Sequence, residues 1–300
     1  ILCTSFFIIK LERMYFMETG LLVCRLNVLK NINKRTGILA AIEACFIVCM
    51  LQPFVDIAKS EGFSLTPFGF PIMQSENIAH LVLLSSAILF LANCPFDDAL
   101  TFDIIAKCGY KNFFLGNILF IGMFSGIYIL FVQFIALLCI LPVIDFSFSW
   151  GTGWYNYLDI NILIRYHTVF PVEPYILYNF SAAEALLLSS LLEWYLVTFL
   201  GLLSYCLNRL THRSLGLLAM VIFALLDLTI YNMYPFFWYF VSPVSLAMLT
   251  TYQYSSFSGN VTLAYGQFFF PITIGLLILG CFYIECILTK KKGVVLCVKY

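Results

Sequence analysis

Three carboxylate side chains stand inside long apolar stretches of this sequence, and they are the residues best placed to do chemistry. They are Glu43, Glu193 and Asp227. An ionised carboxylate is costly in a low-dielectric surrounding, so such a group is either protonated and hydrogen-bonded between helices or lines a wet pathway for protons. The stretches around them contain no Lys or Arg. This absence favours the hydrogen-bonded form for Glu193 and Asp227.

Two further acids, Asp56 and Glu285, lie close to the ends of apolar stretches. Side chains at such positions reach toward water, so we expect both at an interface. The sequence carries no phosphate-binding glycine loop that ends in Lys, no His-Glu-x-x-His and no Gly-x-Ser-x-Gly. We therefore predict no catalytic residue in this chain.

The cysteine pattern does not indicate a metal site. The 11 cysteines include no Cys-x-x-Cys pair, which is the spacing that structural zinc sites use. We expect no bound metal, and cysteines that serve as small, soft core side chains.

The composition places these residues in a membrane protein. Hydrophobic residues make up 62% of the chain and charged residues 11%, whereas soluble domains carry about 25% charged residues. The mean hydropathy is +0.96. The formal net charge is zero, so no charge-driven affinity for nucleic acid is expected. We predict an all-α integral membrane fold whose partner is the lipid bilayer.

Six segments are long and apolar enough to cross a bilayer, which requires about 20 residues of helix. They are Ile38–Ile57, Ile78–Cys94, Phe113–Leu141, Ala185–Leu207, Leu215–Tyr239 and Gln267–Leu288. Prolines occur between or directly after several of them, as expected at turns. The chain then divides into an N-terminal cytoplasmic or interfacial segment (1–35), a six-helix membrane domain (36–289) and a basic tail (290–300).

The orientation follows from the basic residues. All of the 16 Lys and Arg except Lys59 and Arg165 fall on one set of connections. Cytoplasmic connections carry the excess of Lys and Arg in membrane proteins. We therefore expect both termini in the cytoplasm, with the chain in the cell membrane.

The connection after the second span, residues 95–111, reads as a short amphipathic helix on the inner surface. Acids lead and bases trail, in agreement with the helix dipole, and Leu100, Ile104 and Ile105 share one face. Gly109 is placed to end this helix before the third span. Phe96 and Lys107 flank the apolar face, while Asp97, Asp98 and Asp103 present charge to the cytoplasm.

Two aromatic segments are expected on the outer side. The loop after the third span contains Trp150 and Trp154, which suit the belt of aromatic residues at a membrane interface. Residues 235–249 are apolar and aromatic but too short to span. They predict a re-entrant or interfacial hairpin before the last helix.

The run from Ala92 to Leu119 and the Ser242-Pro243-Val244-Ser245 element together carry a family resemblance. The first has a Pro-Phe and acidic start, then Lys107-Cys108-Gly109-Tyr110-Lys111, then an aromatic, a Gly and a span. Both resemble the permease subunits of ABC-2 type transporters, of the Gram-positive type without a fused ATPase domain. The resemblance covers roughly Arg25 to Lys292.

This resemblance implies that transport requires several different protein chains. A permease of this family pairs with a second permease, and its inner connection couples to a cytoplasmic ABC ATPase. The resemblance implies that the residues in contact with this ATPase are Phe96, Asp97, Asp98, Asp103, Lys107 and Lys111. ATP and Mg would be bound by that ATPase, so no cofactor is expected in this chain, which would export a hydrophobic or amphipathic cargo. The acidic residues of the inner connection, and Cys108 where an Arg or Ser is common, depart from the usual family pattern.

Two other functions remain open from the sequence. One is a proton-coupled secondary carrier that uses Glu43, Glu193 or Asp227 as a relay. The other is a membrane immunity or assembly protein that transports nothing and binds a peptide through its outer aromatic loops.

Overall fold

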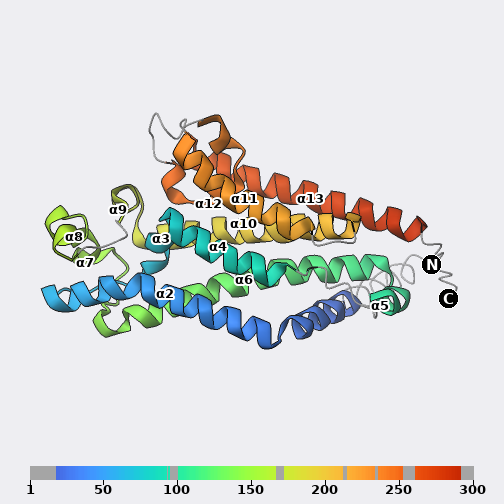
Figure 1. The fold of residues 1–300 in the computed structure, drawn as a ribbon, viewed down its shortest axis with the longest axis horizontal. Helices are drawn as coiled ribbons and strands as arrows, with labels where there is room; N and C mark the ends of the chain where they lie inside the picture. Colours follow the sequence, from blue (N-terminus) through green and yellow to red (C-terminus); the bar gives the residue numbers. More distant parts are fainter. Residues whose placement is uncertain are drawn as a thin grey trace, which may run out of the picture.

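The computed structural model is an elongated helical bundle (Figure 1). It describes residues 18–92, 94, 101–166, 172–211, 215–233, 236–252 and 261–291. Over these residues there is no regular strand, and one isolated parallel β-bridge pairs Leu65 with Ile144. The predicted all-helical fold is therefore confirmed for the described part of the chain.

The described helices begin with residues 18–31. They continue with α2 (Lys34–Glu61), α3 (Gly69–Gln74), α4 (Asn77–Leu91), α5 (Thr101–Cys108), α6 (Tyr110–Ile140), η1 (Leu141–Val143), α7 (Gly151–Asn156), α8 (Ile160–Tyr166), α9 (Pro174–Asn179), α10 (Ala182–Thr211), α11 (Leu215–Met233), η2 (Phe236–Phe240), α12 (Pro243–Ala247), η3 (Leu249–Tyr252) and α13 (Leu263–Lys291).

Four helices of the described part are long and apolar enough to cross a membrane: α2, α6 with η1, α10 and α13. They coincide with four of the six predicted spans. The other two predicted spans correspond to shorter apolar helices, α4 (Asn77–Leu91) and the first part of α11 (Leu215–Leu226). Four of the six predicted spans are thus helices of spanning length, and a six-span arrangement stays a prediction.

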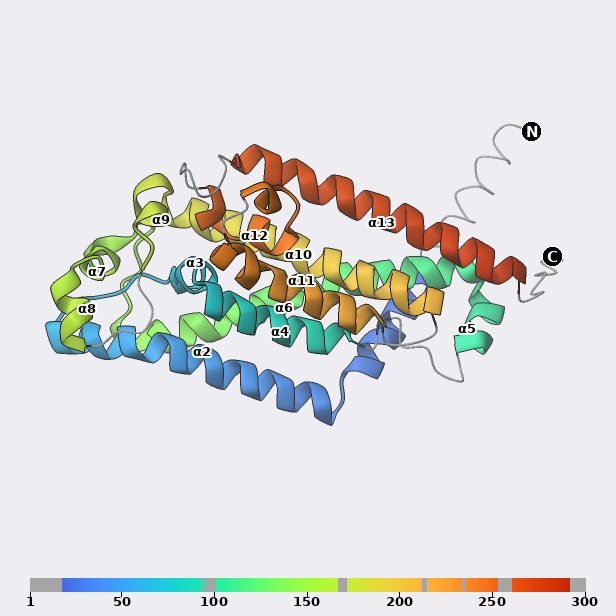
Figure 2. The same cartoon turned by 45° about the horizontal axis from the view of Figure 1, so that its top comes forward.

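Helix α10 lies at the centre of the bundle and packs against α13, α11, α6 and α4, while α2 packs against α6 and α4. The long helices run along one common axis (Figures 1 and 2). The helix of residues 18–31, α5 and the last turns of α13 lie at one end, which we call the α5 end. Helices α7, α8 and α9 lie at the other end, which we call the α7 end (Figure 2).

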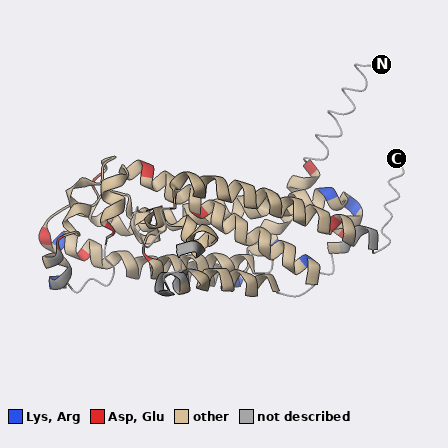
Figure 3. Ribbon diagram, turned by 90° about the horizontal axis from the view of Figure 1, so that it is seen from above, with Lys and Arg blue, Asp and Glu red and all other residues tan. Residues whose placement is uncertain are grey.

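Charged residues are sparse along the bundle and lie mainly toward its two ends (Figure 3). Lys59 and Arg165, which the sequence places apart from the other basic residues, belong to α2 and α8 at the α7 end, where Arg165 donates to Glu61 at 2.9 Å. Lys107 and Lys111 lie at the α5 end on α5 and α6. The assignment of the α5 end to the cytoplasm stays a prediction.

The prediction that Trp150 and Trp154 face a membrane interface is wrong. Their exposed fractions are 4% and 0%. Trp154 Nε1 donates to the carbonyl oxygen of Thr66 at 3.2 Å, and Trp150 Nε1 donates to that of Phe180 at 2.8 Å. A buried indole needs such an acceptor for its N–H. Trp154 therefore holds the segment after α6 onto the connection between α2 and α3, and Trp150 ties the same segment to the end of α9.

Candidate functional site

The junction between α3 and α4, just before the second hydrophobic segment, creates the main polar site of the bundle. Helix α3 ends at Gln74, and α4 begins at Asn77, where the Glu76 side chain caps it by accepting from the Ala79 N–H at 2.6 Å. All six residues of α3 are buried. The sequence assigned this stretch to an outer connection, so a buried helical piece inside the bundle was missed.

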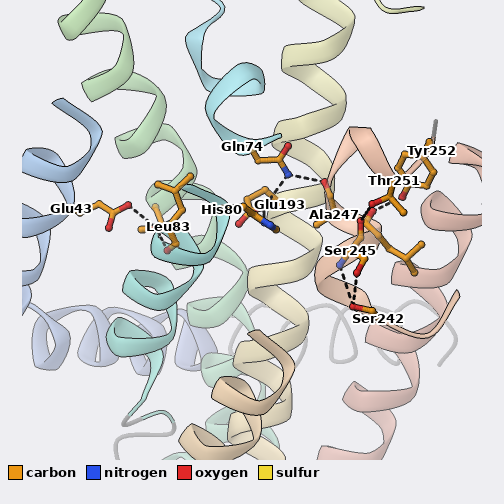
Figure 4. A network of polar contacts seen from close by, with 12 residues as sticks. Glu43, Gln74, His80, Leu83, Glu193, Ser242, Ser245, Ala247, Thr251 and Tyr252 are labelled. Atoms are coloured by element: carbon orange, nitrogen blue, oxygen red, sulfur yellow. Dashed lines mark hydrogen bonds and ion pairs between the residues drawn. The ribbon is translucent and has the colours of Figure 1, made fainter. Parts of the chain in front are cut away.

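Three side chains from three helices meet at this break. His80 Nε2 lies 2.8 Å from Glu193 Oε2, and Gln74 Nε2 lies 3.3 Å from the same oxygen. Gln74 also donates to the carbonyl oxygen of Ala247, at the end of α12, at 2.7 Å. None of the three side chains is more than 2% exposed. Figure 4 shows this group between α4, α10 and α12.

The expectation that Glu193 has no basic partner is therefore corrected. His80 supplies a titratable nitrogen within hydrogen-bond distance, although it lies 113 residues earlier in the chain. The pair can exist as an ion pair or as a neutral acid with a neutral imidazole, and in either form it holds a proton that can move between the two groups. The sequence does not indicate this contact, because the two residues are far apart in the chain and only Lys and Arg were expected as basic partners.

Two oxygens of this group have unused hydrogen-bonding capacity. Glu193 Oε1 and Gln74 Oε1 are buried and have no hydrogen-bond partner among the described residues, and the same holds for the Ser189 hydroxyl one turn before Glu193. A buried acceptor without a donor is costly. The site is therefore suited to a water, a proton or another hydrogen-bond donor beside Glu193.

Glu43 is a second buried carboxylate close to this group. The Tyr128 hydroxyl lies 3.2 Å from Glu43 Oε1 and 2.5 Å from the carbonyl oxygen of Leu83. Leu83 belongs to α4, the helix that also carries His80. In Figure 4 Glu43 and the Glu193 group form one row across the bundle. The structure therefore brings two of the three predicted intramembrane acids together.

The remaining predicted acids have different outcomes. Asp227 belongs to α11, but its side chain lies outside the described residues. Asp56 is exposed and accepts from Gln52 at 2.8 Å, in agreement with the prediction. The prediction that Glu285 reaches an interface is wrong, because its side chain is 1% exposed.

Glu285 is buried in an ion pair with Arg209. Arg209 donates to it twice, from Nε at 2.6 Å and from Nη2 at 2.8 Å. The Tyr205 hydroxyl donates to the same carboxylate at 2.6 Å, and the guanidinium lies 5.6 Å from the centre of the Phe113 ring. A two-pronged charge-assisted bond of this kind holds both groups in place. It ties α10 to α13 near the first turn of α6.

The predicted inner connection is described in part. Asp103 and Lys107 are exposed on α5, and Lys111 is exposed in the first turn of α6. Gly109 separates the two helices with a φ of 80°, as predicted. Burial raises the pKa of the Cys108 thiol, so this cysteine stays neutral. Phe96, Asp97 and Asp98 lie outside the described residues.

The Ser-Pro element before the last helix has a structural explanation. The Ser242 hydroxyl accepts from the Ser245 N–H at 3.3 Å, and Pro243 is the first residue of α12. Ser, followed by Pro at the first helical position, is a strong helix start. The described residues of the predicted hairpin form η2, α12 and η3, and the carbonyl oxygen of Ala247 accepts from Gln74. The re-entrant or interfacial placement of this segment stays a prediction.

Comparison of the chain with protein-family models, with curated proteins and with solved structures finds no significant match. The geometry described above therefore carries the functional argument. It provides a proton-holding group in the bundle and an exposed, charged short helix at the α5 end.

Proposed function

We propose that this chain is the membrane-spanning permease subunit of an ATP-driven ABC-2 type exporter. The observation that carries the proposal is α5. It is a separate short helix with Asp103 and Lys107 exposed, and Gly109 joins it to the longest apolar helix among the described residues. A short charged helix at the base of a span is the element through which a cytoplasmic ATPase would move a permease.

In this proposal the α5 end faces the cytoplasm and the chain resides in the cell membrane as one of two permease subunits. A separate ABC ATPase binds ATP and Mg, and its closure moves α5 and with it α6. The cargo is hydrophobic or amphipathic. The resemblance of residues 92–119 and of the Ser-Pro element to ABC-2 permeases supports this assignment over a permease of another type.

The first test exchanges the charge of α5. The tagged chain is purified in mild detergent from its native membrane, and the co-purifying ATPase is identified by mass spectrometry and measured by ATP hydrolysis. Asp103→Lys is expected to lower the recovered ATPase about tenfold, because placing like charges opposite each other costs several kcal/mol at an interface.

The matched control is Asp145→Lys, which makes the same change at an exposed position beyond the other end of α6. It should leave ATPase recovery unchanged. The proposal fails if no ATPase accompanies the wild-type chain, or if both variants recover the same amount.

A second function, a proton-coupled carrier, is favoured by the His80–Glu193 pair and the partnerless oxygen beside it. Proteoliposomes that contain this chain alone would then move a lipophilic cationic dye under an imposed pH gradient without ATP. Glu193→Gln should abolish this movement, because the amide cannot release a proton at this site. The exposed Glu184 on the same helix supplies the control variant Glu184→Gln. Equal rates for both variants, or no movement by the wild type, would exclude the carrier.

A further inference from the structure

The helix of residues 18–31 has an apolar side that faces outward and a polar side that faces inward, which is the reverse of a surface helix in a soluble protein. Its outward side carries Leu21, Leu22 and Leu29, which are 51%, 56% and 58% exposed. Its inward side carries Asn27 and Asn31, which are 3% and 8% exposed. A helix in contact with water shows the opposite pattern. The outward side of this helix is therefore suited to a surrounding that is more apolar than water.

The inward side is held firmly against α6. The Asn27 side-chain amide donates to Asn117 Oδ1 at 3.0 Å, and both side chains are buried. The two backbones approach so closely that a Cβ on Gly116 would lie 2.8 Å from the carbonyl oxygen of Gly20. The leucine face thus cannot turn inward by rolling the helix without breaking this contact.

Basic residues accompany the leucine face. Arg25 lies between the exposed leucines and is itself exposed, and Lys34 is exposed directly after the helix. Lys30 and Arg35 also belong to this segment, whereas Glu18 is the only acid among residues 18–35. A leucine face interrupted and followed by basic residues fits the boundary between acyl chains and anionic headgroups. An Arg among leucines can extend its guanidinium to the headgroup level while its stem stays in the apolar layer.

We propose that residues 18–35 bind anionic phospholipid, with the exposed leucines among the acyl chains and with Arg25 and Lys34 on the phosphates. The segment lies at the same end as α5 (Figure 2), so the lipid would belong to the leaflet on that side. This inference does not depend on the proposed permease function, because it needs only that the long helices cross a membrane.

The test measures lipid binding to the full chain. The protein is purified in neutral detergent, washed free of lipid, and titrated with dioleoylphosphatidylglycerol or dioleoylphosphatidylcholine while bound lipids are counted by native mass spectrometry. The wild type should bind phosphatidylglycerol more tightly. Arg25→Gln should weaken phosphatidylglycerol binding roughly fivefold and leave phosphatidylcholine binding unchanged, since one basic residue is lost from the anionic contact.

Lys59→Gln is the matched control, because Lys59 is an exposed base at the α7 end. It should bind both lipids as the wild type does. Leu22→Ser combined with Leu29→Ser should weaken binding of both lipids, since these side chains contact acyl chains rather than headgroups.

Three results would overturn the proposal. The first is equal phosphatidylglycerol affinity for Arg25→Gln and Lys59→Gln. The second is a dimer that dissociates in the double leucine variant, which would show that a second copy covers this face. The third is equal affinity of the wild type for phosphatidylglycerol and phosphatidylcholine, which would show that the segment does not select anionic headgroups.

Discussion

Replacement of Arg209 with Met should lower the free energy of unfolding by about 3–5 kcal/mol. The change removes both guanidinium bonds of Arg209 from a carboxylate that is 1% exposed, so the buried charge of Glu285 loses a large part of its stabilisation. Reversible SDS titration in mixed micelles measures the difference.

The double variant Arg209→Met with Glu285→Leu tests the physical reason. A buried ion pair replaced by apolar side chains of similar size is often nearly neutral, so most of the lost stability should return. Lys59→Met, which removes an exposed base, should change stability by less than about 0.5 kcal/mol. Equal instability of the single and double variants would show that the ion pair itself, and not the buried carboxylate left without Arg209, determines the loss.

The second large effect is expected from Gly153→Ala at the α7 end. A Cβ on Gly153 would lie 2.0 Å from the carbonyl oxygen of Ser64. That backbone cannot easily withdraw, because the neighbouring Leu65 N–H donates to Val143 at 2.9 Å and its carbonyl accepts from Asp145 at 2.8 Å. Overpacking of this kind costs about 1–3 kcal/mol, and a contact with backbone belongs at the upper end.

Gly122→Ala is the matched control, because nothing lies within 4 Å of a Cβ at that position in α6. It should be neutral or stabilising by up to about 1 kcal/mol through helix propensity. SDS titration compares the two variants, and hydrogen exchange of residues 150–158 localises the effect. If the Gly153 variant is as stable and as protected as the Gly122 variant, α7 does not pack on the α2–α3 connection as described.

The sequence pattern was sufficient to predict the long apolar helices and the helix junction at Gly109. Both depend on local features, namely runs of apolar residues and a glycine at a helix end. It was not sufficient for α3, because Pro71 was interpreted as a helix breaker. Pro71 is the third residue of α3, and proline is tolerated in the first turn of a helix, where its missing N–H has no partner within the helix.

Contacts between residues far apart in the sequence were not predicted either. Glu193 was correctly selected as a buried polar residue, but His80 is 113 positions away and belongs to another helix. Arg209 was assigned to a connection because it lies at the end of an apolar run, yet it packs against Glu285. Which helix faces are in contact depends on tertiary packing, and the hydropathy of a single segment does not contain this information.

Helix α6 runs without interruption from α5 to the segment that contacts the α2–α3 connection. Its 31 residues span about 46 Å, from the Gly109 junction with α5 to η1, which is followed by the Ile144–Leu65 bridge. Leu65 lies four residues before α3, the helix that ends at Gln74. A tilt of roughly 5° about the α5 end would displace the far end by about 4 Å for a rod of this length. Helix α6 is therefore a lever arm, through which a small rotation at α5 would shift α3 against the Glu193 group.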